Sequence, residues 1–181
     1  MAIIGLANLH YAKMLTEDTA TSAAVYDKPK RLIGINSVSI SPTVDTATLY
    51  GDNKALATLT NSKEYQVTLE IADLPPEDEA ALLGHKIDDD GIIHVAGNDT
   101  SPYVAILFDA DTHHDNEKMY VKFFKGKFSP SQQDLNTRGE NLEFGLHSLE
   151  ATFVTRMYDD LTYDKFVTTD TTVAKTWYAE V

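Results

Sequence analysis

The chain has no cysteine among its 181 residues and no long run of apolar residues. The lack of cysteine excludes disulfides, thiolate catalysis and cysteine-ligated zinc. No segment approaches the roughly 20 consecutive apolar residues of a transmembrane helix, and residues 1–15 lack the basic start and apolar stretch of a signal peptide. We therefore expect a protein that folds in the cytoplasm and does not associate with a membrane.

Positive charge is also scarce. The sequence has 15 Lys and Arg against 28 Asp and Glu, for a net charge of −13, and the acids are spread along the whole chain. Nucleic-acid binding needs a basic surface that neutralises phosphates, so this balance argues against it. The short basic run at residues 28–31 is more simply a solvated loop before a strand.

The common signatures of catalysis and metal binding are missing as well. The sequence has no phosphate loop, no HExxH helix and no nucleophile elbow. His113 and His114 are adjacent, and neighbours in a turn seldom ligate one ion. Residues 88–91 resemble the start of a calcium loop without its twelfth-position glutamate, so a tight turn explains them better. We expect no catalytic residue, no metal site, no cofactor and no enzymatic activity.

A clear two-residue period marks the segment 64–71. Its apolar positions are Tyr65, Val67, Leu69 and Ile71, and its polar positions are Glu64, Gln66, Thr68 and Glu70. This period predicts a strand with one face in a core and the other in polar surroundings.

The segment 32–41 is the expected partner of this strand. Its apolar residues change parity between Ile35 and Val38, so we expect a bulge at Asn36 or Ser37. Such a bulge would bring Ile33, Ile35, Val38 and Ile40 onto one face.

Between these two strands lies the segment 42–63, which we take to be too long for a tight hairpin turn. Connections above about 12–15 residues are uncommon in compact domains. Leu49, Tyr50, Leu56 and Leu59 punctuate the segment, and apolar side chains that no core covers indicate a partner surface. We expect a projecting loop that contacts another molecule. The alternative is a mobile loop that folds onto its own domain.

The rest of the chain predicts β structure with one short helix. Residues 73–84 have proline at the start, acids in the first turn and glycine at the stop of a helix. Residues 102–108 predict a strand buried on both faces, and residues 119–128 and 141–155 predict a strand pair joined by a polar loop. We expect a single domain, an antiparallel β-sandwich or barrel of about seven or eight strands with one flanking helix.

Both ends of the chain are expected to be arms. Residues 1–31 have mixed apolar content that can dock on the sheet. Residues 157–181 are polar and threonine-rich and carry Trp177 and Tyr178. This aromatic pair must dock on a neighbour or on its own sheet if it is to leave water.

Short motifs follow one another in order along nearly the whole chain. They are Gly5–Ala12, Thr48–Asn53, Glu70–Pro75, Leu82–His85, Pro102–Ala105, Phe124–Pro130, Thr137–Phe144 and Ala151–Phe153. No single motif is specific, but their succession resembles the major tail protein family of long, non-contractile phage tails. Since the sequence ends at Val181, we do not expect the immunoglobulin-like domain that some larger relatives append.

This resemblance implies a structural virion protein, the tail tube subunit of a siphophage, similar in fold to the tube protein of type VI secretion. Its copies would form hexameric rings that stack into a hollow tube, and DNA would pass through without specific binding. The implied partners are further copies of the chain, the tape measure protein, the tail terminator and the baseplate or distal tail proteins. The implied location is the virion tail, after assembly in the host cytoplasm.

The resemblance also assigns roles to residues. Contacts within or between rings fall to the projecting loop, through Thr46, Thr48, Leu49, Tyr50, Gly51, Asp52, Asn53, Leu56 and Leu59. The face of Glu64, Gln66, Thr68 and Glu70 is assigned to the lumen. Its carboxylates would repel phosphates over about 8–10 Å. The alternative is that this face meets solvent outside the tube.

A monomeric receptor- or carbohydrate-binding β-sandwich of a phage is the competing interpretation. It predicts a concave aromatic patch on the surface. The aromatic residues available in the predicted strands are Tyr103, Tyr120, Phe123 and Phe124, which we expect in the core instead.

Overall fold

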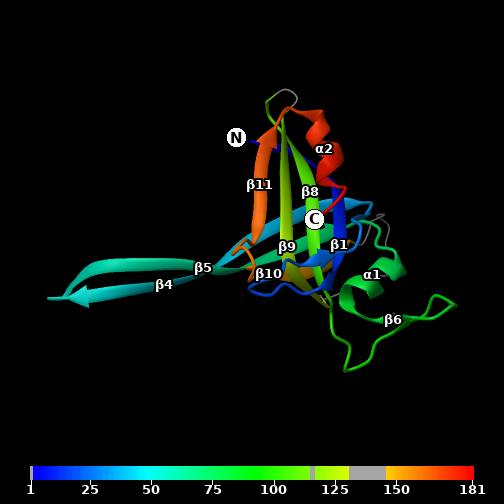
Figure 1. Cartoon of the computed structure of the whole chain (residues 1–181), viewed down its shortest axis with the longest axis horizontal. Helices are drawn as coiled ribbons and strands as arrows, with labels where there is room; N and C mark the ends of the chain where they lie inside the picture. The colour runs from blue at the N-terminus through cyan, green and yellow to red at the C-terminus, as the bar shows by residue number, and fades with distance from the viewer. Residues whose placement is uncertain (1, 115–116, 131–145) are drawn as a thin grey trace, which may run out of the picture.

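Antiparallel strands make up most of the chain in the computed structural model, which describes residues 2–114, 117–130 and 146–181 (Figure 1). The elements are β1 (Ile3–Thr16), β2 (Val25–Tyr26), β3 (Lys30–Arg31), β4 (Ile35–Gly51), β5 (Lys54–Ile71), α1 (Pro76–Leu83), β6 (Lys86–Ile87), β7 (Ile93–His94), β8 (Tyr103–Thr112), β9 (Lys118–Ser129), β10 (His147–Val154), β11 (Tyr163–Thr168) and α2 (Thr171–Trp177). The main sheet has the order β2–β1–β8–β9–β10–β5–β4, with β3 on β1 and β11 on β9, while β6 and β7 form a separate small hairpin. Every strand pairing among the described residues is antiparallel. The prediction of a mainly β, antiparallel fold is therefore confirmed.

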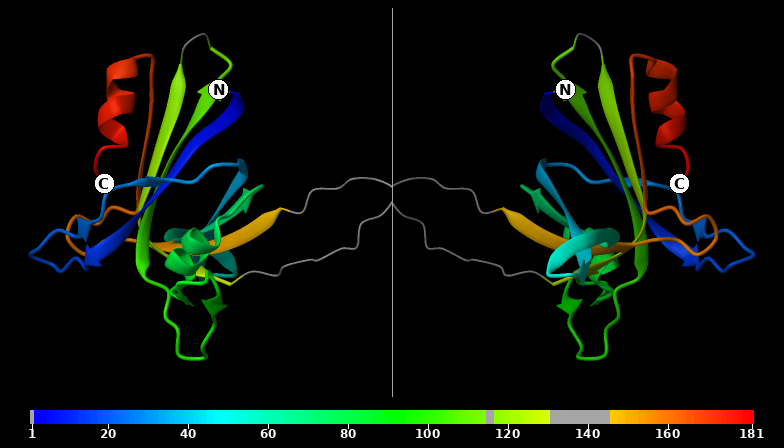
Figure 2. Two further views of the ribbon diagram at one scale, coloured as in Figure 1. Left: turned by 90° about the vertical axis from the view of Figure 1, so that its right-hand side faces the viewer. Right: turned by 90° about the vertical axis from the view of Figure 1, so that its left-hand side faces the viewer.

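The main sheet bends so that two of its parts enclose one core. β1, β8 and β9 form the first part, and β10, β5 and β4 cross it as the second (Figures 1 and 2). Between them lie the buried side chains of Leu9, Val67, Leu69, Val104, Ile106, Phe123 and Phe153, and α1 adds Leu82 and Leu83. The arrangement is a sandwich with a flanking helix. Within the described ranges the strands do not close into a barrel, because β2 and β4 remain at the two ends of the sheet order.

The predicted strand pair at 32–41 and 64–71 is present. β4 pairs with β5, and its register shifts between Ile35 and Ser37, so the predicted bulge is confirmed. Ile33 departs from the prediction and is 73% exposed. It lies before the strand, because Gly34 turns the chain with a φ of 89° and its carbonyl accepts a hydrogen bond from Ala72 N at 2.7 Å.

The prediction that residues 42–63 form a loop too long for a tight hairpin is wrong. β4 and β5 continue through the whole segment and meet at a two-residue turn of Asp52 and Asn53. Both residues have positive φ, 51° and 57°, as a type I′ hairpin turn requires. The paired strands project well beyond the sandwich (Figure 1). We call residues 44–61 the arm.

β8 and β9 are buried on both faces, as the sequence predicts for residues 102–108. In β8, Val104 and Ile106 point into the core, while Ala105 and Leu107 on the opposite face are also fully buried. The second cover comes from the C-terminal segment, since α2 lies on the side of β8 and β9 away from β10 and β5 (Figure 2). The predicted polar loop between the strands of this pair spans residues 129–140, and all of it after Pro130 lies outside the described residues. Leu142 and Phe144 of the predicted strand 141–155 lie outside them as well.

The terminal segments are more ordered than simple arms. Residues 3–16 form β1, which lies within the sheet between β8 and the short strands β2 and β3. The C-terminal region forms β11 and α2, so the described residues contain two helices where one was predicted. The sequence pattern does not reveal β1, because a bulge interrupts its two-residue alternation. The register of β1 on β8 shifts between Ala7 and His10, where Asn8 has a φ of 54°.

Candidate functional site

The arm has two chemically different faces. Ala47 lies opposite Leu59 and Leu49 lies opposite Ala57, so these four residues share one face, which we call the aliphatic face. The residues between them, Thr46, Thr48, Thr58 and Thr60, form the threonine face. Leu49 and Leu59 are 64% and 76% exposed. The subunit therefore carries leucines away from its own core.

The tip of the arm adds further apolar surface. Tyr50 is 71% exposed and Leu56 is 67% exposed. Leu56 is the extra residue of a bulge, because Leu49 pairs with Ala57 while Tyr50 pairs with Ala55. Its side chain lies over Gly51, where an added Cβ would be 2.4 Å from Leu56 Cδ1.

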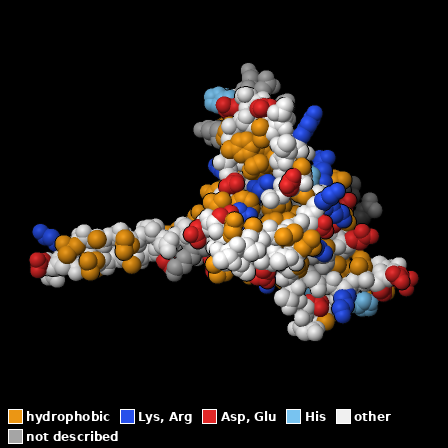
Figure 3. All heavy atoms as spheres, in the orientation of Figure 1, with side chains coloured by type: hydrophobic (Ala, Val, Ile, Leu, Met, Phe, Trp, Pro, Cys, Tyr) orange, Lys and Arg blue, Asp and Glu red, His pale blue; other side chains and the backbone are white. Residues whose placement is uncertain are grey.

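All nine residues predicted as contact residues are thus placed together on the arm. In the space-filling view, hydrophobic side chains gather along the arm at a distance from the sandwich (Figure 3). A projection of this kind cannot bury its apolar groups in its own core. Contiguous exposed apolar surface indicates an interaction with another protein.

The predicted polar face lies on the body of the sandwich. Glu64, Gln66, Thr68 and Glu70 line one face of β5, and Val67, Leu69 and Ile71 lie buried on the other. The neighbouring strands continue the polar face, with Thr43, Ser41, Ser39 and Ser37 opposite on β4 and Thr152, Glu150 and Ser148 opposite on β10. Val154, opposite Glu64, is the apolar exception. The alternation predicted for this strand is confirmed.

Carboxylates dominate the charge of this face. Glu64 and Glu70 lie on β5, Glu150 lies on β10, and Lys127 of β9 is opposite Thr152. Glu70 Oε2 accepts hydrogen bonds from Ser37 Oγ at 2.8 Å and Asn36 Nδ2 at 3.2 Å. The surface is hydroxyl-rich and acidic, which suits it to repel phosphate groups within about one Debye length.

Trp177 and Tyr178 dock on the sheet of their own chain. Tyr178 Oη donates a hydrogen bond to Asp109 Oδ1 at 2.5 Å, and its ring stacks on His10 with a centroid distance of 4.4 Å. Burial, together with the acceptor Asp109, raises the pKa of Tyr178. The Trp177 ring lies 4.8 Å from that of Phe166. The aromatic pair therefore packs on side chains of β1, β8, β9 and β11.

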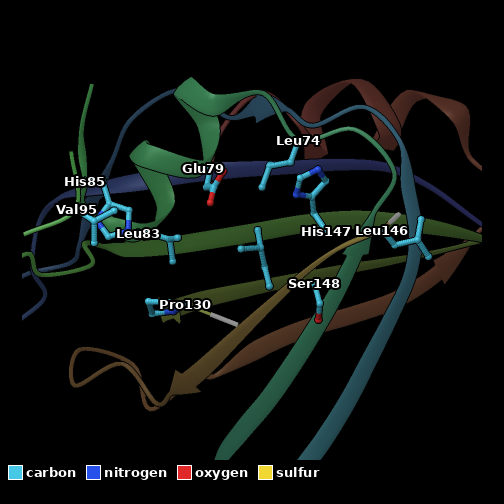
Figure 4. Close-up of a pocket in the computed structure, with 10 residues that line it drawn as sticks. Leu74, Glu79, Leu83, His85, Val95, Pro130, Leu146, His147 and Ser148 are labelled. Carbon is cyan, nitrogen blue, oxygen red and sulfur yellow. The ribbon is translucent and has the colours of Figure 1, made fainter. Parts of the chain in front are cut away.

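A pocket lined by apolar and ionisable side chains lies beside α1 (Figure 4). Leu74, Leu83 and Val95 contribute apolar walls, and Glu79 and His85 contribute polar groups. His85 Nδ1 lies 2.9 Å from Asp99 Oδ2, a pair that the sequence analysis missed because 14 residues separate its members. The hydrogen bonds from Ala96 N and His85 hold the pKa of Asp99 below its usual range.

The other candidate motifs form structural turns. Asp88 Oδ1 accepts hydrogen bonds from Asp90 N and Ile92 N, which confirms the predicted tight turn. The rings of His113 and His114 are 6.3 Å apart and tilted. Within residues 2–114, 117–130 and 146–181, no group of three or more His, Cys, Asp or Glu side chains is arranged to hold a metal ion.

The competing binding-module interpretation needs surface aromatics. Tyr120, Phe123 and Phe124 are buried, and Tyr103 is half-buried beneath Lys125 and Lys127. Its aromatic candidates therefore contribute packing rather than a concave patch. No helix in the described part of the chain is long and apolar enough to cross a membrane.

Comparison with known proteins agrees with this arrangement. A family model described as "Phage tail tube protein" matches residues 16–180. A search of curated protein sequences gives no significant match. The family match covers β2 to α2, including the arm, the polar face and the docked C-terminal segment. The chain therefore belongs to the phage tail tube protein family.

Proposed function

We propose that the protein polymerises as stacked hexameric rings into the tail tube of a siphophage, the conduit through which DNA is delivered into the host. The observation that carries this proposal is the arm, which places exposed leucines beyond the reach of their own core. A ring needs a heterologous contact that closes, and stacking needs a second contact that continues. The arm supplies surface for such contacts, and the role is structural rather than enzymatic.

The free edge of β4 is a second feature that suits assembly. β4 is 17 residues long and ends the order of the main sheet. An exposed edge strand presents unpaired N–H and C=O groups that can pair with another chain. Pro42 and the three register shifts of the β4–β5 pair limit where such pairing can run.

We assign the polar face of β5 to the lumen. Glu64 and Glu70 on this face, with Glu150 beside them on β10, would repel DNA phosphates at short range and keep the duplex from adhering to the wall. The net charge of −13 supports passage without specific binding. Tape measure protein inside the tube, and terminator and distal tail proteins at its ends, are the expected partners, with assembly in the host cytoplasm.

Reversing the charge of this face tests the lumen assignment. Changing Glu64→Lys and Glu70→Lys together should leave assembly intact but hinder DNA delivery, because lysines in the wall would attract phosphates. Phage carrying the double variant should form tails of normal appearance and deliver DNA poorly in a potassium-efflux or infectivity assay.

The matched control is Asp89→Lys with Asp90→Lys, which changes the net charge equally at exposed positions away from β5. This control should infect normally. Equal infectivity of both double variants would reject the lumen assignment without affecting the proposal of a tube.

Light scattering of the purified protein tests the ring size. Species near six times the 20.0 kDa mass of one chain, or polymers built from them, support hexameric rings. A closed ring of another subunit number would contradict the hexamer and leave the tube.

A further inference from the structure

A second apolar surface lies on the opposite side of the body from the arm. The arm projects from one side of the sandwich, while α1 and β6 lie on the other (Figure 1). Heterologous assembly joins two different surfaces of identical subunits, and repetition is simplest when these surfaces face opposite ways. The side that carries α1 and β6 is therefore where a receptor for the arm is to be sought.

This side contains an open groove between α1 and the chain that follows it. The groove has a volume of about 360 Å³ and is lined by Ala80, Ala81, Gly84, Ile87, Thr100 and Pro102, with Lys13, Glu77 and His85 around them. We call it the α1 groove. Its lining residues all lie in the described part of the chain, and most of them are small or apolar.

Gly84 sets the depth of the α1 groove. It ends α1 with a φ of 76°, and a Cβ at this position would lie 2.3 Å from Thr100 O. Glycine therefore lets residues 100–102 approach the end of the helix closely. Because the adjoining Ala81 is also small, the groove has room for a large side chain from another molecule.

The arm and the α1 groove complement each other in shape and charge. Leu49 and Leu59 are large, exposed aliphatic side chains, whereas the groove is lined largely by small residues. The tip of the arm carries Asp52 and Lys54, and the groove is bordered by a cation and an anion, Lys13 and Glu77. Opposite charges at the rim can fix the orientation of the arm.

We propose that the aliphatic face of the arm of one subunit docks in the α1 groove of a second copy of the chain. This inference rests on the proposed assembly and names the receptor for the arm. It separates the two faces of the arm, because the aliphatic face enters the groove and the threonine face points away. The arm cannot reach the groove of its own chain, since β4 and β5 carry the arm away from the side of the body where α1 lies (Figure 1).

The absence of cysteine makes cross-linking a clean test. One batch of protein carries Leu49→Cys or Leu59→Cys on the aliphatic face, and a second batch carries Ala81→Cys or Ile87→Cys in the groove. The control batch carries Thr58→Cys, which neighbours Leu59 on the threonine face. Batches are mixed under assembly conditions, oxidised, and analysed for covalent dimers on non-reducing gels, with electron microscopy of the same samples.

Mixtures of aliphatic-face and groove variants should give at least about tenfold more dimer than mixtures with Thr58→Cys, because a disulfide forms only when the Cα atoms come within about 7 Å. Each variant alone should remain largely monomeric on the gel. Mass spectrometry of the dimer should identify the arm–groove peptide pair.

Two results would overturn the proposal. Equal cross-linking from Thr58→Cys would show that the arm does not present its aliphatic face to the groove. No dimer from any aliphatic-face and groove mixture would reject the groove as the receptor. Microscopy separates this outcome from failure of the proposed function, because tubes that form without arm–groove cross-links would leave the tube proposal standing.

Discussion

Replacing Leu49 and Leu59 together by aspartate should abolish tube formation and leave a folded monomer. Both side chains are exposed in the subunit, so the change in unfolding free energy should stay within about 0.5 kcal/mol per site. Burying each leucine at a contact contributes about 1.5–3 kcal/mol, and every 1.4 kcal/mol is tenfold in affinity. The pair should weaken each contact by roughly 10²–10⁴-fold before the cost of burying a carboxylate is added.

The matched control changes the other face of the same hairpin. Thr48→Asp with Thr60→Asp has the same diagonal relation across the two strands as Leu49 and Leu59, because Thr48 lies opposite Thr58 as Leu49 lies opposite Ala57. Sedimentation of assembled material and thermal unfolding of the soluble fraction measure the two effects. Normal tubes from the leucine variant would remove the aliphatic face from the assembly mechanism.

Changing Asp18→Ala should destabilise the subunit by about 3–5 kcal/mol, because it removes the close, buried partner of a buried cation. Asp18 Oδ1 accepts a hydrogen bond from Lys125 Nζ at 2.6 Å, and both side chains are buried. Asp18 Oδ2 accepts a second hydrogen bond from Met157 N. The carboxylate therefore joins the segment after β1, the middle of β9 and the segment after β10, and urea denaturation measures its contribution.

The neighbouring Glu17 supplies the control. Its side chain is 66% exposed and its Oε2 lies 4.0 Å from Lys125 Nζ, so Glu17→Ala should change stability by less than about 1 kcal/mol. Similar losses of unfolding free energy from Asp18→Ala and Glu17→Ala would show that burial does not determine how much each carboxylate stabilises the protein.

The same carboxylate predicts a dependence on pH. Burial raises the pKa of Asp18, but the hydrogen bonds from Lys125 and Met157 N outweigh it and hold the pKa below its usual value. A lowered folded-state pKa stabilises the protein above the unfolded pKa of about 3.9, and this contribution is lost as pH falls through the folded pKa. Wild-type protein should therefore lose more stability below about pH 4 than Asp18→Asn does.

Local periodicity explains why the centre of the fold was predictable. The strict alternation at 64–71 gave the buried and polar faces of β5, and the parity change between Ile35 and Val38 gave the bulge. Such patterns indicate which residues of a strand face the core, because the buried face must be apolar.

The arm shows where this signal ends. Neither face of residues 44–61 is buried. Alanine or leucine alternates with threonine in this segment, but without a buried face the alternation is weak, and the segment is easily taken for a loop. Its turn carries Asp52 and Asn53 with positive φ and lacks the Asn-Gly or Asp-Gly sequence that usually indicates a type I′ hairpin. The residues predicted to make contacts do lie on a projecting segment, because leucines in a stretch with no core pattern indicate exposure whatever its secondary structure; their role as contacts stays a prediction.

Contacts between distant segments were beyond the sequence. Asp18 with Lys125, and Tyr178 with Asp109, join residues 107 and 69 positions apart. The α1 groove is likewise formed by residues from β1, α1, β6 and the segment before β8. Periodicity describes neighbours in a strand or helix, whereas these pairs depend on how the sheet bends.

Electron microscopy of the concentrated wild-type protein, with a second sample seeded by short tail tubes, tests the central claim that this chain polymerises into a tube through its arm. The account predicts hollow tubes of uniform diameter in at least the seeded sample, and none when Leu49 and Leu59 are both aspartate. Wild-type protein that stays monomeric in both samples, or tubes that form equally well from the aspartate variant, would contradict it.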